Sequence, residues 1–291
     1  MTWKANNGYW YADLAQRIIE TKGLVTVEIP HPKDHPYLQF MMLSDDLTAL
    51  FQTNADTSPV TAVDQAVGRW RNSYGPATMI FDQGTAGARP LYNPTGEANL
   101  GTLGVPTVYF AGTDDVLIHT EANAFSTHAS GTIIWWGRID SAVGGANTNT
   151  LFCSSDTGAS NRYLRMHAAT DDHFYCDVQE GAVLESQGGD GFIGRESVMT
   201  IYTATNDGAN TQLYMNGTND DLGPGFGALW FSGVTLRDNV ALGAKVDNIP
   251  NDFLVGAMGG MAYFYPHLPY WDIRLVEQWI RDKYNTPPIV P

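Results

Sequence analysis

A hairpin signal at residues 211–217 is the feature that most constrains the fold of this chain. Leu213 and Met215 alternate with polar or amphipathic residues, so they lie on one face of an extended strand. The strand ends at Asn216-Gly217, a dipeptide typical of a two-residue β-hairpin turn. Short β-rich runs separated by Gly, Asn, Asp and Ser recur from about residue 108 to about 265. The pattern predicts an all-β sandwich in the middle of the chain.

Composition supports a folded core and disfavours two classes of partner. Of the 291 residues, 43% are hydrophobic and 16% are charged, which is enough apolar material for a core and argues against disorder. A formal net charge of −15 repels phosphate backbones and anionic lipid, so we expect no nucleic acid and no membrane as partners. Residues 1–8 show no apolar signal-peptide core. We expect synthesis in the cytoplasm without a signal peptide.

Residues 1–45 are predicted to form a small separate element. Leu14 and Ile18 recur at helical spacing, and residues 24–29 alternate as a strand that ends before a proline. A segment this short cannot bury its aromatic side chains by itself. We therefore expect it to pack on the sandwich of the same chain or on another chain. The predicted attachment residues are Trp3, Tyr9, Trp10, Tyr11, Leu14 and Ile18.

Residues 272–284 have the pattern of an amphipathic helix. Ile273, Val276, Trp279 and Ile280 fall on one stripe of such a helix. We therefore expect a C-terminal helix that docks on the sandwich through this stripe.

The order of motifs across residues 47–284 resembles a known family. Four leader motifs carry the first half of the resemblance: Leu-Phe-Gln at 50–52, Pro-Val-Thr-Ala at 59–62, Val-Gly-Arg-Trp at 67–70 and Arg-Pro at 89–90. Together they resemble the segment that precedes a concanavalin A-like (laminin G-like) domain in many structural proteins of tailed bacteriophages. Ser73-Tyr74-Gly75-Pro76 replaces the turn that usually follows the Trp. The hairpin at 214–217 and the Lys-Tyr end of the helix are also similar to that family.

This resemblance implies an architecture. The chain would be a concanavalin A-like jelly-roll sandwich over residues 46–291, including a leader at 46–107 and the C-terminal helix at 272–284. Residues 1–45 would be an α+β attachment element in front of it.

The resemblance also implies a function and a location. It implies a non-enzymatic virion structural protein, either a capsid decoration or cement protein or a surface-projecting one, bound to major capsid or tail proteins. Because virion surfaces are symmetric, a homo-oligomer follows, with a trimer as the natural guess. The alternative is a tail- or head-associated adhesin that recognises host surface glycans.

Catalytic motifs known in this fold are missing from the sequence. Laminarinase-like enzymes place carboxylates on one strand as E-x-D-x-x-E, because two of them must flank the glycosidic bond. No Glu of this chain is followed two positions later by Asp. We expect no enzyme and no catalytic residue, although a glycan-cleaving enzyme with carboxylates on separate strands stays open as a third hypothesis.

Metal and thiol chemistry has little support in the sequence. Cys153 and Cys176 lie in separate candidate strands without metal or redox spacing, so we expect free, half-buried thiols. Three histidines, His128, His167 and His173, are interpreted as isolated side chains. No cofactor is expected. The first candidate for a calcium site is the pair Asp171-Asp172, with Asp114-Asp115 and Asp220-Asp221 as further acidic pairs.

Exposed aromatic rings are the remaining route to a ligand. Sugars stack on Trp and Tyr rings that a rigid sheet holds in place. The predicted ligand-binding residues on the sandwich are Trp230, Tyr163, Tyr175 and Tyr214, with Phe231 beside them. Trp135 and Trp136 are adjacent, so they face opposite sides of a strand and at most one is expected in the core.

Overall fold

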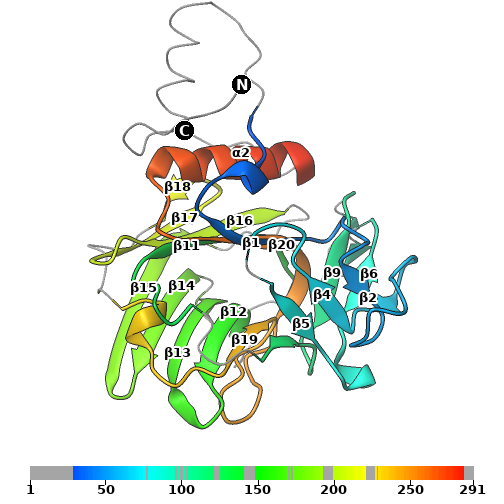
Figure 1. Ribbon diagram of the computed structural model, residues 1–291, viewed down its shortest axis with the longest axis horizontal. Helices are drawn as coiled ribbons and strands as arrows, with labels where there is room; N and C mark the ends of the chain where they lie inside the picture. Colours follow the sequence, from blue (N-terminus) through cyan, green and yellow to red (C-terminus); the bar gives the residue numbers. More distant parts are fainter. Residues whose placement is uncertain are drawn as a thin grey trace, which may run out of the picture.

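Two stacked antiparallel sheets with one helix on the outside form the described part of the chain (Figure 1). The computed structural model describes residues 29–76, 78–95, 97–98, 101–102, 104–120, 125–140, 148–169, 171, 173–192, 199–220, 227 and 229–284. Within these residues each main sheet has nine strands. The predicted all-β sandwich with a C-terminal helix is confirmed.

The first sheet carries the helix on its outer face. Its strands run in the order β18 (Thr218–Asn219), β17 (Thr211–Met215), β16 (Thr200–Asn206), β11 (Gly131–Ile139), β20 (Val255–Phe264), β9 (Thr107–Ala111), β6 (Leu91–Asn93) and β3 (Gln65–Ala66), with β1 (Leu38–Leu43) also paired to β20. Helix α2 (Tyr270–Tyr284) lies across this sheet (Figure 1).

The second sheet closes the other side of the core. Its strands run in the order β15 (Val183–Phe192), β14 (His173–Glu180), β13 (Ala159–Ala168), β12 (Asn149–Asp156), β19 (Asn239–Leu242), β10 (Leu117–His119), β5 (Ile80–Asp82), β4 (Arg69–Arg71) and β2 (Leu50–Phe51). Smaller elements are the pair β7 (Glu97–Ala98) and β8 (Gly101–Thr102), and the 3-10 turns η1 (Pro32–Asp34), η2 (Ala86–Ala88) and η3 (Phe231–Gly233).

The hairpin predicted at 211–217 is confirmed. Asn216 and Gly217 have φ angles of +52° and +79°, as a two-residue turn with positive φ at both central positions requires. The Asn216 side chain accepts a 3.0 Å hydrogen bond from the Ile201 amide, which ties the turn to the neighbouring strand β16. The sequence therefore specifies both the turn and its register.

Both faces of strand β11 are buried, which corrects one prediction. Trp135 faces the second sheet and packs 5.7 Å from the Tyr202 ring, measured between centroids. Trp136 faces the other way and lies 5.7 Å from the ring of Tyr284 on α2. The expectation that at most one of these tryptophans is in the core is wrong, because α2 gives the outer face of this sheet a core of its own.

Helix α2 begins two residues before the predicted start at 272 and ends at the predicted residue. Ile273, Val276 and Ile280 are buried against the sheet, and Trp279 is partly buried. The amphipathic stripe is confirmed as the docking face. In the described part of the chain, no helix combines the length and the hydrophobicity needed to cross a bilayer.

The boundary predicted at residue 45 does not coincide with a structural boundary. Strand β1 pairs with β20 over Leu38–Leu43, and its side chains are mostly buried in the sandwich. The sandwich therefore includes the chain from Leu38 onward, because the backbone hydrogen bonds of β1 are part of the first sheet. The predicted leader, 46–107, likewise supplies β2, β4 and β5 to one sheet and β3 and β6 to the other.

The predicted attachment residues lie outside the described part of the chain. They are Trp3, Tyr9, Trp10, Tyr11, Leu14 and Ile18. Their proposed role stays a prediction.

Candidate functional site

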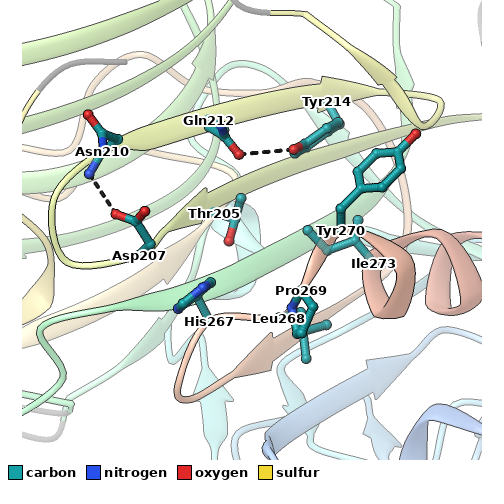
Figure 2. Close-up of a pocket in the computed structure, with 10 residues that line it drawn as sticks. All are labelled: Thr205, Asp207, Asn210, Gln212, Tyr214, His267, Leu268, Pro269, Tyr270 and Ile273. Atoms are coloured by element: carbon teal, nitrogen blue, oxygen red, sulfur yellow. Dashed lines mark hydrogen bonds between the residues drawn. The ribbon is translucent and has the colours of Figure 1, made fainter. Parts of the chain in front are cut away.

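A pocket lies between the β16–β17 hairpin and the start of α2 (Figure 2). Its volume is about 110 Å³, small beside the roughly 300–1,000 Å³ of drug-sized sites. Ten residues line it: Thr205, Asp207, Asn210, Gln212, Tyr214, His267, Leu268, Pro269, Tyr270 and Ile273. Strand ends, a turn and a helix start thus supply polar, aromatic and aliphatic side chains to one hollow.

The floor of the pocket is held by two threonine hydroxyls. Thr205 Oγ1 and Thr132 Oγ1 lie 2.7 Å apart, on the neighbouring strands β16 and β11. Thr132 Oγ1 also accepts a 2.9 Å hydrogen bond from the Leu268 amide. The segment that leads into α2 is therefore anchored directly to the sheet below the pocket.

Asp207 is an ionised acceptor at one end of the pocket. Its Oδ1 accepts hydrogen bonds of 2.8 Å from the amides of Ala209 and Asn210, which orients the carboxylate within the β16–β17 turn. Partial burial opposes ionisation, but these amides and the nearby His267 outweigh it and lower the pKa of Asp207 from its ordinary value. Because Oδ1 holds both amides, Oδ2 is available to accept from a ligand.

Tyrosine rings and a carboxamide form one wall. The Tyr214 hydroxyl donates a 3.0 Å hydrogen bond to Gln212 Oε1. A carboxamide has separate acceptor and donor ends, so this bond leaves the Nε2–H donors of Gln212 to serve a ligand. The Tyr214 and Tyr270 rings lie 5.7 Å apart. Tyr270 is 43% exposed, so the rim presents an aromatic ring to solvent; the next residue, Trp271, is 57% exposed but is not among the lining residues.

Contacts below the pocket hold its two walls in a fixed relation. Thr203 Oγ1 on β16 donates a 2.8 Å hydrogen bond to Glu277 Oε1 on α2, and both side chains are buried. The Arg274 guanidinium donates to the carbonyl of Gly217, in the turn between β17 and β18. The hairpin wall and the helix wall therefore form one rigid frame, which favours a preformed pocket.

The four predicted ligand-binding aromatics are dispersed, and only Tyr214 reaches this pocket. Trp230 is fully buried between the sheets, 5.8 Å from Phe231, so it offers no surface for a sugar. Its prediction as an exposed ring is wrong, because the η3 segment carries it into the core rather than onto the surface. Tyr214 is only 4% exposed, so it supports the wall more than it forms an open platform.

Tyr163 and Tyr175 lie on the outer face of the second sheet, far along the chain from the pocket residues. Tyr163 is largely covered, with the Lys245 ammonium 4.2 Å and the Arg165 guanidinium 5.4 Å from its ring centroid. Tyr175 is partly exposed and stacks on His167 at 5.4 Å between centroids. Their assignment as ligand-binding residues stays a prediction for a different face of the molecule.

The same outer face carries a buried ionic network. Asp177 accepts hydrogen bonds from Arg165 at 3.0 Å, His167 at 2.8 Å and Ser186 at 2.6 Å. Arg165 also pairs with Asp252 at 2.7 Å. His167 is thus a partner of carboxylate and guanidinium groups rather than an isolated side chain, and the network ties strands β13, β14 and β15 together.

The calcium prediction finds no built site among the described residues. Asp171 accepts hydrogen bonds from the Tyr175 hydroxyl at 2.8 Å and from the His173 amide at 3.2 Å, while Asp172 lies outside the described residues. In the described ranges, no three side chains of His, Cys, Asp or Glu gather in a way that could hold a metal ion. Calcium binding by Asp171 and Asp172 stays a prediction.

The cysteines are free, and both are fully buried rather than half-buried. Burial raises the pKa of Cys153 to about 11 and raises that of Cys176 further. The reason is that Cys176 faces the core between the sheets, while Cys153 lies under the segment that carries Val246. Neither thiol is placed for chemistry at neutral pH.

A second hollow, of about 580 Å³, lies beside β4, β5 and β10. Its main charged groups are already paired, because Arg69 donates to both oxygens of Asp82 at 2.6 and 2.8 Å. Of the described residues that line it, none is a tyrosine, tryptophan or phenylalanine. The pocket beside α2 therefore has the stronger case as a ligand site.

Sequence reasoning missed most of the residues of that pocket. Asp207 and Asn210 lie on either side of Gly208-Ala209 in the β16–β17 turn, where Asp, Gly and Asn are common for reasons of turn geometry alone. Tyr270 and His267 belong to the segment before the helix stripe, where no periodicity marks them. The signal that was available is Tyr270-Trp271, two adjacent rings at a helix start, outside its buried stripe.

Comparisons with known proteins show a similar fold and do not establish a family. No family model and no curated protein matches the chain. Among solved structures, the binding domain of botulinum neurotoxin serotype D has a TM-score of 0.50 and 14% identity, covering 84% of this chain and 52% of its own. The CBM40 module of Ruminococcus gnavus IT-sialidase, bound to alpha2,3 sialyllactose, has a TM-score of 0.45 and 15% identity, covering 51% and 82%.

The likeness to the neurotoxin binding domain concerns the fold alone. At such identities a likeness concerns the arrangement of strands, and function depends on the site that each sandwich carries. The resemblance to bacteriophage structural proteins is not tested by these matches and stays a prediction.

Proposed function

We propose that this chain is a carbohydrate-binding protein that holds a sugar between the β16–β17 hairpin and the start of α2. The observation that carries the proposal is the pocket of Figure 2, where Asp207 and Gln212 face the same hollow as the exposed ring of Tyr270. Planar polar side chains pair with neighbouring sugar hydroxyls, and aromatic rings stack on the apolar C–H face of a pyranose. The pocket contains planar polar side chains and an aromatic ring, held in place by the contacts between α2 and the sheet.

Binding suits this pocket better than hydrolysis. Hydrolysis of a glycosidic bond ordinarily needs two carboxyl groups on opposite sides of that bond. Among the lining residues that the structure describes, Asp207 is the one carboxylate. Its lowered pKa also makes it a poor general acid at neutral pH, because it stays ionised.

Size sets what part of a glycan the pocket receives. A volume of about 110 Å³ accommodates a single ring or the edge of one, not a chain of sugars. The exposed ring of Tyr270 extends beyond the hollow and would contact the next residue of a glycan. We therefore expect recognition of a terminal sugar.

The proposal is tested by probing a glycan array with the full chain and with single-residue variants. Tyr270→Ala and Gln212→Ala should each abolish most of the signal of the wild-type protein. Asp282→Asn is the matched surface control, because Asp282 is exposed near the far end of α2. A blank array for the wild-type chain contradicts the proposal. If Tyr175→Ala loses the signal and Tyr270→Ala keeps it, the sugar binds on the second sheet and not beside α2.

The bacteriophage resemblance supports a further proposal, about location. The leader motifs at 50–52, 59–62, 67–70 and 89–90 favour a virion protein, in which glycan binding would make the chain a tail- or head-associated adhesin. Capsid decoration, a homo-oligomer such as a trimer and attachment through residues 1–45 belong to the same proposal. Cryo-electron microscopy of particles from the source tests it: density in symmetric positions supports it, and absence of the chain from particles refutes it.

A further inference from the structure

We infer that the pocket beside α2 selects an uncharged sugar with an apolar substituent, of the N-acetylhexosamine type, and rejects sugars that carry a carboxylate. This inference rests on the proposed function and names the ligand class of the same site. It follows from the charge of the lining and from the division of the pocket into a polar and an apolar end.

Charge in the lining disfavours an anionic ligand. Asp207 contributes a carboxylate, and no lysine or arginine is among the described residues that line the pocket. The guanidinium of Arg274 donates to the Gly217 carbonyl and lies 5.9 Å from the Tyr270 ring centroid. A sugar carboxylate in this hollow would face the Asp207 carboxylate, and the one basic side chain of the described lining, His267, already lies close enough to Asp207 to lower its pKa. The chain as a whole carries a net charge of −15.

Polar and apolar groups lie at opposite ends of the pocket. Figure 2 shows Asp207, Asn210 and His267 at one end, and Pro269, Tyr270 and Ile273 at the other, with Gln212 and Tyr214 along the side between them. Leu268 and Ile273 are almost fully buried and form an apolar base there. A ligand that fits must be polar on one edge and apolar on the other.

An N-acetyl group matches this division. Its methyl group would pack on the aliphatic end, and its carbonyl could accept from the Nε2–H donors that Gln212 keeps while Oε1 holds Tyr214. Ring hydroxyls at the opposite edge would donate to Asp207 Oδ2. A hexose without the acetyl group leaves the aliphatic end in contact with water, so it should bind less tightly.

The test is ligand-observed NMR titration of the full chain with three groups of methyl glycosides. They are N-acetylglucosamine and N-acetylgalactosamine, then glucose and galactose, then glucuronic acid and N-acetylneuraminic acid. We expect the N-acetylhexosamines to bind about fourfold more tightly than the parent hexoses, as burial of one methyl group implies. The acidic sugars should bind roughly tenfold or more weakly than the N-acetylhexosamines.

Asp207→Asn separates charge from shape. The amide is isosteric and keeps an oxygen to accept from Ala209 and Asn210, so the turn should be retained. The variant should lose affinity for N-acetylhexosamines, because a charge-assisted hydrogen bond is gone, and should gain about tenfold in relative affinity for acidic sugars. Asp282→Asn should change neither.

The outcomes distinguish a failure of the proposed selectivity for N-acetylhexosamines from a failure of the proposed carbohydrate binding. Acidic sugars that bind as tightly as N-acetylhexosamines overturn this inference and leave carbohydrate binding intact. Equal affinity for hexoses and N-acetylhexosamines overturns the role of the apolar end. A full chain that binds no sugar of any group overturns the proposed function, and the inference with it.

Discussion

Replacing Glu277 with Gln should stabilise the protein at alkaline pH and leave it nearly unchanged at acid pH. The Glu277 side chain is fully buried between α2 and the sheet, where Thr203 donates to Oε1 and Oε2 has no partner among the described residues. Burial raises the pKa of Glu277 from 4.5 to about 7, although the Thr203 hydrogen bond and the charges of Arg274 and Arg281 oppose the rise.

The sign of the effect follows from proton linkage. A carboxyl group with a raised pKa in the folded state is protonated there at pH values where the unfolded chain has already ionised, so stability falls as pH rises from 4.5 through about 7. The full loss corresponds to roughly 3 kcal/mol at about 1.36 kcal/mol per pKa unit. Between pH 5.5 and 8.5, which covers the upper part of that range, the ionisation of Glu277 should lower the free energy of unfolding by about 2 kcal/mol.

Urea unfolding of the wild-type and Glu277→Gln proteins at pH 5.5 and 8.5 measures this directly. The amide keeps an oxygen to accept from Thr203 and cannot ionise, so the difference between the two proteins should grow by about 2 kcal/mol toward pH 8.5. Other titrating groups cancel in the difference. A difference that is the same at both pH values, or that shrinks as pH rises, refutes the reasoning.

Three further predictions concern how side chains pack in the sandwich and under α2. Trp136→Ala should cost about 3–5 kcal/mol in urea unfolding because the ring is fully buried under α2, whereas Trp271→Ala should change stability little because that ring is 57% exposed; equal costs would contradict the double-core description. Gly217→Ala should cost about 1–3 kcal/mol, because φ is +79° and a Cβ atom would meet side chains of α2. Cys153 and Cys176 should react with Ellman's reagent only after unfolding, since both are buried with raised pKa values; fast reaction of the native protein would be inconsistent with this packing.

Local signals in the sequence predict the parts of the fold that local physics determines. The Asn216-Gly217 turn is such a case, because positive φ at two successive positions is rarely available to other residues. The stripe that includes Ile273, Val276 and Ile280 is another, since its spacing leaves one docking face. The hairpin, the sandwich class and the helix could therefore be predicted before any coordinates.

Tertiary contacts determine what the sequence could not reveal. Trp136 alternates with Trp135 as if it faced solvent, and only the docking of α2, more than 130 residues later, buries it. Trp230 likewise has no local signal for its burial in the core. Strand β1 seemed separate because its partner β20 lies at the opposite end of the chain.

The pocket was hidden for the same reason. Asp207 comes from a turn and Gln212 from the strand that follows it, whereas Tyr270 comes from the start of a helix about 60 residues later. None of them belongs to a motif, and only the packing of α2 on the β16–β17 hairpin brings them to one hollow. Of the aromatics chosen from the sequence, Tyr214 alone has a place in it.

The most direct test of a sugar site beside α2 is a crystal structure of the full chain grown with a bound N-acetylhexosamine glycoside. The account predicts density for one sugar ring between Asp207 and Tyr270, with its N-acetyl group toward Ile273. A sugar bound instead on the outer face of β13 and β14, beside Tyr163 and Tyr175, would contradict the site.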